Sequence, residues 1–74
     1  MIPPPKKSIL DNFERLGAPH GRKRWKDPNT GRLFEWDSMH GEIEVYNSRG
    51  YHIEVVDKSG DRVKGPVKGR TIDV

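Results

Sequence analysis

The stretch Phe34-Glu35-Trp36-Asp37-Ser38-Met39-His40-Gly41-Glu42-Ile43-Glu44-Val45-Tyr46 decides how this chain folds. Its two ends, Leu33–Trp36 and Glu42–Tyr46, mix β-branched or aromatic residues with polar ones at period two, which predicts strands. Between them, Asp37–Gly41 is rich in turn formers and predicts a loop. The stretch therefore predicts a hairpin, and the rest of the chain must cover its apolar side.

The second strand of this hairpin has two chemically different faces. Ile43 and Val45 point to one side because side chains alternate along a strand. The opposite side carries Glu42, Glu44 and Tyr46. A strand that begins at His40 adds an imidazole to this second side. The expected result is one apolar face and one acidic, titratable face.

Length and composition restrict the class of protein. The 74 residues allow one small domain, which buries only about 60% of its unfolded surface or slightly more. The chain has no cysteine, which excludes disulfides and thiolate zinc sites. No apolar run approaches the ~20 residues of a membrane span, and no signal-peptide pattern is present. The net charge of +3 favours polyanionic partners.

The N-terminal segment predicts a short helix after an extended lead-in, Pro3–Pro5. Ser8 can cap this helix, and Asp11 stands at the capping-box position. Apolar residues follow at i, i+4 and i+7, and Gly17 ends the pattern. The apolar residues are Ile9, Phe13 and Leu16. We expect an amphipathic helix of about two turns that packs on a sheet.

Turn signals divide the remainder into five or six short strands. The predicted strands are Arg22–Lys26, Arg32–Asp37, Glu42–Tyr46, Tyr51–Val56, Arg62–Lys64 and an edge strand Thr71–Val74. In Tyr51–Val56, alternation places Tyr51, Ile53 and Val55 opposite His52 and Glu54. The expected fold is α+β, a short N-terminal helix packed on a highly twisted antiparallel sheet. Residues 1–21 form the N-terminal segment and residues 22–74 the catalytic sheet, within one domain.

One group of polar residues has the composition of an acid–base site. It consists of Asp37, His40, Glu42 and Glu44. Metal-free RNA cleavage needs a base for the 2′-OH, an acid for the departing 5′-oxygen, and cations near the phosphorane. Carboxylates beside one another and beside a histidine can supply both acid and base. A solvated polar face has the same pattern, and a histidine–carboxylate metal site is a further alternative.

Two basic groups could contact a polyanion. The first lies around Gly65-Pro66 and Gly69, where the backbone can approach phosphate closely; its cations are Arg62, Lys64, Lys68 and Arg70. The second is Arg22–Lys26, in which four cations surround Trp25 and which suits backbone contact with base stacking. A lysine-rich sheet edge and a core position for Trp25 are the alternatives. His20 and His52 are interpreted as surface residues.

These motifs, taken together, resemble the cytotoxic domain of ribosome-cleaving E-type colicins and cloacin. The resemblance covers about Lys23 to Ile72. Its most specific parts are the Trp-Asp-Ser-x-His-Gly-Glu-x-Glu run from Trp36 to Glu44 and the Lys-Gly-Pro-x-x-x-Arg tail from Lys64 to Arg70. The first twenty residues do not match this pattern.

The resemblance implies a role for individual positions. It makes Glu44 the general base, His40 the general acid, Asp37 an orienting partner and Arg70 the essential arginine. Lys64 is implied to face the scissile phosphate, and Glu42 is implied to be a further acidic residue near the site. Phe34 is implied to be a supporting residue of the site, but it stands where the family has tyrosine, so a hydroxyl is missing there. Met39 replaces a polar residue.

The implied function is that of a toxin ribonuclease that cleaves small-subunit (16S) ribosomal RNA at the decoding centre. Attack by the 2′-OH would leave a 2′,3′-cyclic phosphate without metal or cofactor. The expected RNA-contacting residues are Lys23, Arg24, Trp25, Lys26 and Lys68. Expected partners are the ribosome and an acidic immunity protein, with the domain otherwise monomeric. Such a domain is delivered from a producing bacterium within a larger toxin and acts in the target-cell cytoplasm. The alternatives are a non-catalytic RNA- or ribosome-binding β module and a metal-dependent nuclease built on Asp37, His40 and Glu42.

Overall fold

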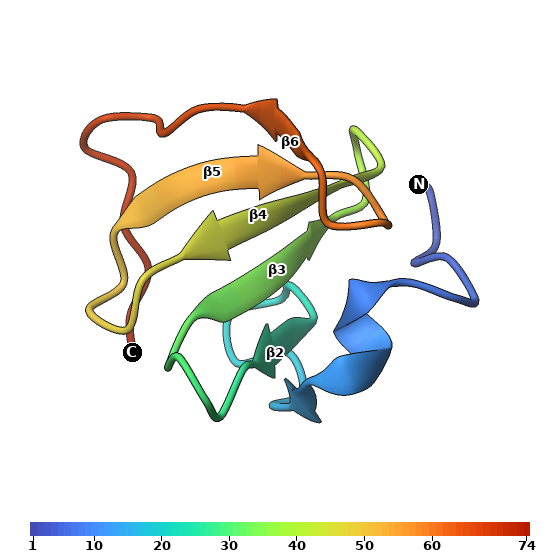
Figure 1. Ribbon diagram of the computed structural model, residues 1–74, viewed down its shortest axis with the longest axis horizontal. Coiled ribbons are helices and arrows are strands. Elements are labelled where there is room, and N and C mark those ends of the chain that lie inside the picture. The colour runs from blue at the N-terminus through green and yellow to red at the C-terminus, as the bar shows by residue number, and fades with distance from the viewer.

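Six antiparallel strands form a single sheet whose order is the order of the chain (Figure 1). The computed structural model describes all 74 residues. The strands are β1 (Glu14–Arg15), β2 (Arg24–Lys26), β3 (Leu33–Asp37), β4 (Glu42–Tyr46), β5 (His52–Val56) and β6 (Arg62–Lys64), and one 3-10 turn, η1 (Ile9–Asn12), precedes them. The predicted antiparallel sheet of five to six strands is confirmed. No helix in the structure has the length and apolar character needed to span a membrane.

The central hairpin β3–β4 has the predicted alternation of faces. Phe34 pairs with Val45, and Trp36 pairs with Ile43, so these side chains share the apolar face. The intervening positions face the other side. This second face, called the site face below, holds the paired positions Leu33 and Tyr46, Glu35 and Glu44, and Asp37 and Glu42.

The apolar face forms the core of the molecule. Its buried members are Leu10, Trp25, Phe34, Trp36, Ile43, Val45 and Val56. The N-terminal segment covers this face, and Phe13 stacks on Phe34 with ring centroids 4.4 Å apart. Phe34 is therefore a core residue, directed away from the site face. Its interpretation as a residue that supports the site is wrong, because an apolar ring is what this stacked position requires.

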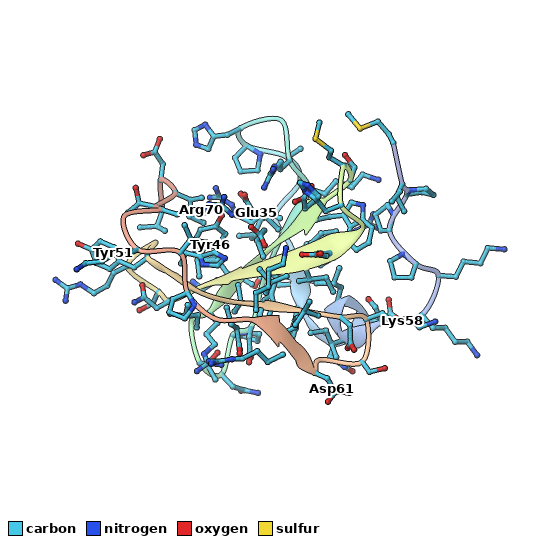
Figure 2. The ribbon with its side chains drawn as sticks, turned by 90° about the horizontal axis from the view of Figure 1, so that it is seen from above. Glu35, Tyr46, Tyr51, Lys58, Asp61 and Arg70 are labelled. Atoms are coloured by element: carbon cyan, nitrogen blue, oxygen red, sulfur yellow. The ribbon has the colours of Figure 1, made fainter.

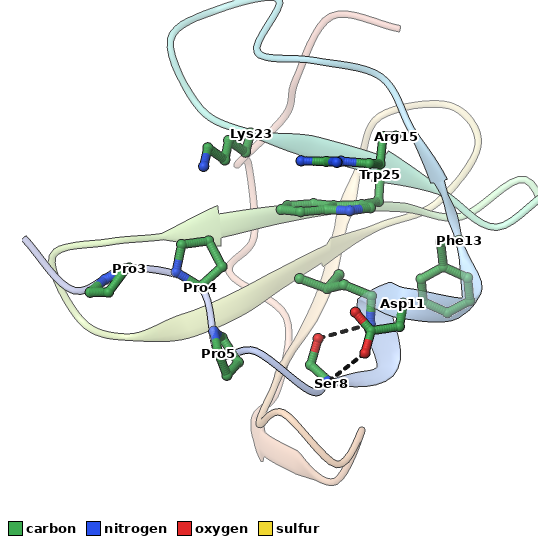
Figure 3. A pocket seen from close by; sticks show the side chains of 10 residues that line it. Pro3, Pro4, Pro5, Ser8, Asp11, Phe13, Arg15, Lys23 and Trp25 are labelled. Carbon is green, nitrogen blue, oxygen red and sulfur yellow. Dashed lines mark hydrogen bonds between the residues drawn. The ribbon is translucent and has the colours of Figure 1, made fainter.

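The predicted N-terminal helix is the main error in the fold. The capping box is present, because the Ser8 hydroxyl accepts from the amide of Leu10 and the Asp11 carboxylate accepts from the amide of Ser8 (Figure 3). The structure then forms only one 3-10 turn, and Phe13 is already extended. Leu10 is buried, whereas Leu16 is exposed. Pairing of β1 with the edge of β2 replaces the helix, so the fold is mostly β rather than α+β.

A bulge in β5 changes which of its residues reach the site face. The register passes from Tyr46–His52 to Val45–Glu54, so Ile53 is the additional residue. Beyond the bulge Val55 faces Glu44, and Val56 faces Ile43. The uninterrupted alternation predicted for Tyr51–Val56 is therefore wrong, and His52 lies on the side of Tyr46.

The C-terminal segment is docked on the sheet but is not a strand. The predicted edge strand Thr71–Val74 is reduced to a single bridge between Tyr51 and Thr71. At the other end of the chain, β1 adds residues to the sheet from within the segment 1–21. The sheet therefore begins earlier and ends earlier than the sequence predicted.

Candidate active site

Two buried carboxylates occupy the centre of the site face. Glu35 and Glu44 are cross-strand partners, and they are only 4% and 3% exposed. Across the sheet, Glu35 is also paired with Arg24 on β2, and Glu44 is also paired with Val55 on β5. Two ionised carboxylates this close repel each other unless cations lie beside them.

Each carboxylate has its own arginine. Arg24 donates from Nε to Oε2 of Glu35 at 2.9 Å, and its Nη2 lies 2.8 Å from the same oxygen without the alignment of a hydrogen bond. Arg70 donates from Nη1 to Oε1 of Glu44. Figure 2 shows Arg70 beside Glu35 and Tyr46 on this face. The pairing compensates the two buried negative charges.

The C-terminal tail, Val67–Asp73, brings Arg70 to Glu44. Its backbone bonds to the start of β5, because the His52 amide donates to the Arg70 carbonyl at 3.0 Å and the Ile72 amide donates to Gly50 at 2.9 Å. Gly50 has φ +87, and a Cβ there would lie 2.3 Å from the Ile72 carbonyl oxygen. A residue with a side chain at position 50 would therefore push the tail away.

Arg24 ties down the end of this tail. Its Nη1 donates to the Asp73 carbonyl at 2.7 Å, and the same side chain is paired with Glu35. The expectation that Arg24 contacts RNA is wrong, because the side chain is buried and its donors are directed inward. Arg24 instead links the buried carboxylates to the segment that carries Arg70.

His52 belongs to the site, although the sequence analysis interpreted it as a surface residue. Its side chain has no exposed area. The Val67 amide donates to Nδ1 at 2.9 Å, so the neutral ring carries its proton on Nε2. This Nε2 lies 3.7 Å from Oε1 of Glu44, too far for a hydrogen bond. Burial lowers the pKa of His52, although the Glu44 charge opposes the shift, so the ring is neutral near pH 7.

Tyr46 also belongs to the site without a predicted role. It is buried on the site face and meets the His52 ring edge-on at 5.2 Å. Burial raises the pKa of Tyr46, and the charges of Glu35 and Glu44 add to the shift. The hydroxyl is therefore protonated at neutral pH. Its position on this face was predicted by the period-two pattern that also aligned Glu42 and Glu44, but that pattern indicated no role for it.

Asp37 and His40 form a pair at the end of β3. Asp37 Oδ2 lies 2.9 Å from His40 Nδ1, while Oδ1 accepts from the amides of Met39 and His40. Burial raises the pKa of Asp37, but the hydrogen bonds from His40 and the charge of Arg22 outweigh it and hold that pKa below 3.8. The carboxylate is ionised and binds Nδ1–H, which leaves Nε2 of the exposed ring free.

The pair and the buried carboxylates belong to one surface. Asp37 is opposite Glu42, which makes Glu44 its diagonal neighbour, about 7–8 Å away in an antiparallel sheet. Glu42 is itself 3.6 Å from the Lys64 ammonium. The site face thus brings together the four residues expected to be catalytic. They are Asp37, His40, Glu44 and Arg70. No three histidine, aspartate or glutamate side chains converge in a way that could hold a metal ion.

Comparison with known proteins identifies the family of this chain and several relatives. Residues 3–73 match the Cytotoxic protein family. The chain belongs to the Cytotoxic family. It is 45% identical to colicin E3 of Escherichia coli over 53 residues, which are 69% of this chain and 10% of colicin E3. It is 45% identical to cloacin and 42% identical to colicin-E6, both from Escherichia coli, over 78% of this chain and 11% of each relative. The predicted resemblance to the colicin and cloacin cytotoxic domain is confirmed, and the chain spans about a tenth of these relatives.

The basic residues of this Cytotoxic domain divide into buried and exposed groups. Arg24 and Trp25 are buried, so Trp25 is a core residue, and its expected contact with RNA bases is wrong. Four further cations, which were expected to meet RNA or the scissile phosphate, are exposed and remain available to a polyanion. They are Lys23, Lys26, Lys64 and Lys68. Arg22 is also exposed, and its charge acts on both Asp37 and Tyr46, which makes it a further cation beside the site.

Proposed function

We propose that this Cytotoxic domain is a toxin ribonuclease that cleaves 16S ribosomal RNA at the decoding centre by attack of a 2′-OH. The observation that carries the proposal is that a candidate base and a candidate acid lie on the same face of the sheet. Glu44 is buried and paired with Arg70, whereas His40 is exposed and is paired with the buried Asp37 at the end of the same face. A base and an acid held apart on one face suit in-line displacement at phosphorus.

Glu44 is the proposed general base. Arg70 and His52 both lie against its Oε1, so Oε2 is the atom left to receive the 2′-OH proton. The O2′–phosphorus bond then forms and the phosphorus–O5′ bond breaks. His40 gives its Nε2 proton to O5′, while Asp37 keeps the ring oriented through Nδ1. The products are a 2′,3′-cyclic phosphate and a 5′-hydroxyl.

Two cations are proposed to stabilise the phosphorane. Arg70 is 45% exposed although its partner is buried, so the guanidinium can serve a substrate phosphate as well as Glu44. Preorganised cations lower the barrier where negative charge develops. Lys64 is the second of these cations. It is 60% exposed beside Glu42, and it is proposed to face the scissile phosphate.

The exposed lysines supply the proposed docking surface for the ribosome. The same positive surface is the proposed binding site of an acidic immunity protein, since the chain carries a net charge of +3. Apart from this complex the domain is proposed to be a monomer. We also propose that it is delivered from a producing bacterium within a larger toxin and acts in the cytoplasm of the target cell.

The test is to incubate the domain with intact ribosomes in excess chelator and to map new ends of the ribosomal RNA. A single cut near the 3′ end of the small-subunit RNA, with a 2′,3′-cyclic phosphate, is the expected result. His40→Ala serves as the chemical control and is expected to cleave about 10²-fold more slowly. His20→Ala is the matched control, because His20 is an exposed histidine that lies 3.7 Å from Asp73 and has no part in the proposed chemistry.

Other outcomes would replace the proposal with one of its alternatives. Cleavage that disappears with chelator and returns with a divalent ion would indicate a metal-dependent nuclease. Ribosome binding without any cut would indicate a non-catalytic RNA-binding module. Equal cleavage by the His40 and His20 variants would remove the acid role from His40.

A further inference from the structure

The N-terminal residues bind the loop that carries His40. The Ile2 amide donates to the Ser38 carbonyl at 2.8 Å, and the Ile2 carbonyl accepts from the indole Nε1 of Trp36 at 2.7 Å. These two partners lie on either side of Asp37. Ile2 therefore bonds to the chain immediately before and immediately after the residue that orients His40.

The Ile2 side chain adds a third contact at the far end of the same loop. Gly41 has φ +67, and a Cβ built on it would lie 3.1 Å from Cδ1 of Ile2. Ile2 thus contacts residues 36, 38 and 41. Between these contacted residues, the Asp37 carboxylate accepts hydrogen bonds from the amides of Met39 and His40.

The chain after Ile2 holds it in place as a stiff spacer. Pro3, Pro4 and Pro5 have no amide hydrogen, and their ring geometry favours an extended conformation. The next backbone bond to the sheet side comes only at Ile9, whose amide donates to Lys58 at 2.9 Å. In Figure 3 the prolines run past Trp25 and Lys23 and border a cavity of about 570 Å³. The segment is thus fixed at its two ends and bridges open space between them.

We propose that Ile2 is a positioning residue, whose clasp on Trp36 and Ser38 fixes the Asp37–Gly41 loop and so presents His40 to the substrate. The catalytic part of this inference rests on the proposed function. The contact of Ile2 with the loop can be measured separately, by amide hydrogen exchange, without an activity assay. The role belongs to the backbone of Ile2 together with its contact on Gly41. Displacement of a catalytic group by about 1 Å can lower a rate by ~10²-fold, so a loop tether of this kind has a measurable effect.

Ile2→Pro removes the amide that binds Ser38 and keeps the carbonyl that binds Trp36. Ile2→Val keeps both hydrogen bonds and most of the side chain, so its amide exchange and its cleavage rate should match those of wild type. Pro4→Ala changes the same segment at a residue that makes no hydrogen bond to the loop. All variants carry the same short N-terminal tag, so that residue 1 is retained in each.

Two measurements are made on every variant. Amide hydrogen exchange of Met39 and His40 reports on the loop, and exchange of the β4 amides reports on the sheet as an internal control for folding. In Ile2→Pro we expect Met39 and His40 to exchange about tenfold faster while β4 is unchanged, because local opening is independent of the sheet. Single-turnover cleavage of ribosomes should show a saturated rate lowered about tenfold or more, with the half-saturating concentration unchanged.

The outcomes separate the two proposals. If Ile2→Pro exchanges and cleaves like wild type, the clasp has no positioning role. If only the half-saturating ribosome concentration changes, Ile2 belongs to the docking surface and the inference is overturned. If the wild-type domain does not cleave ribosomes but Ile2→Pro still loosens Met39 and His40, the proposed function has failed and the structural clasp stands.

Discussion

Glu35 and Glu44 face each other across β3 and β4, and each carboxylate is held by an arginine from a different part of the chain. Arg24 comes from the adjacent strand, and Arg70 comes from the C-terminal tail. Because Arg24 also binds the carbonyl of Asp73, the two ion pairs are joined through the tail. Placement of the proposed catalytic arginine therefore depends on the neighbouring pair.

Arg24→Ala is expected to destabilise the domain strongly. It leaves the Glu35 carboxylate buried without a cation, which typically costs about 3–5 kcal/mol of unfolding free energy. The double variant Arg24→Met/Glu35→Leu removes both charges and should recover most of that loss. Urea unfolding of both variants measures the difference. A single variant as stable as wild type would show that the Arg24–Glu35 pair does not hold the site together.

Glu44→Gln is expected to lower the saturated rate of ribosome cleavage by about 10²-fold or more, because an amide cannot take up the 2′-OH proton. The amide oxygen still accepts from Arg70, so the tail should stay docked. Glu54→Gln is the matched control, since Glu54 pairs with Arg62 at 3.0 Å and its strand position faces Val45 rather than Glu44. Single-turnover rates at saturating ribosomes decide the matter, and similar rates for both variants would remove the base role from Glu44.

Stability should fall as the pH is lowered, in two separate windows. Burial lowers the pKa of His52 from 6.5, so below about pH 6.5 the unfolded chain binds this proton more readily than the folded one. The pKa of Asp37 is also lowered, from 3.8, so its contribution is present above that pH and is lost as the pH falls through its folded value. Unfolding free energies measured between pH 7.5 and 3 should show both declines.

His52→Asn isolates the first of these windows. The asparagine oxygen can accept from the Val67 amide as Nδ1 does, but it takes up no proton in this range. The decline below about pH 6.5 should therefore flatten, while the lower window remains. His20→Asn changes a histidine whose side chain is 57% exposed and should keep the wild-type profile. An unaltered decline in His52→Asn would contradict the assignment of this window to His52.

Lys23→Ala is expected to weaken ribosome binding without slowing the saturated chemical step. For each single-strand phosphate that the protein no longer neutralises, the log–log salt slope of affinity becomes shallower by about 0.7. Because the side chain is exposed, the unfolding free energy should change by no more than about 0.5 kcal/mol. Ribosome binding measured at several salt concentrations gives the slope. A slope equal to that of wild type would remove Lys23 from the docking surface.

Local signals in the sequence predicted much of the site. Alternation placed Glu44 on the face opposite Val45. The pairing of Asp37 with His40, three residues apart, was implied by the family resemblance. The capping box at Ser8 was equally local. Each of these features depends on residues within a few positions of one another, where stereochemistry alone decides which side chains can touch.

Features set by distant parts of the chain could not be predicted in this way. Phe13 matched a helical spacing, but stacking on Phe34 and the pairing of β1 hold it extended, which overrides helix propensity. The bulge at Ile53 reversed the phase of β5 and brought His52 inward. The burial of His52 also requires Val67 from the docked tail. In the sequence, Arg24 lies in a basic run typical of phosphate binding. Only the fold shows that its side chain binds Glu35 and Asp73 instead.

The order of strands in the sheet has a consequence for how the domain refolds. Since every strand pairs with its neighbour in the chain, the sheet can grow by closing short loops, which favours rapid folding. Ile2 on Ser38 and Asp73 on Arg24 are contacts between distant segments and require closure of longer loops. We therefore expect recovery of cleavage to lag behind the fluorescence change of Trp25 and Trp36 in refolding experiments, so that the toxin chemistry is the last property the chain acquires.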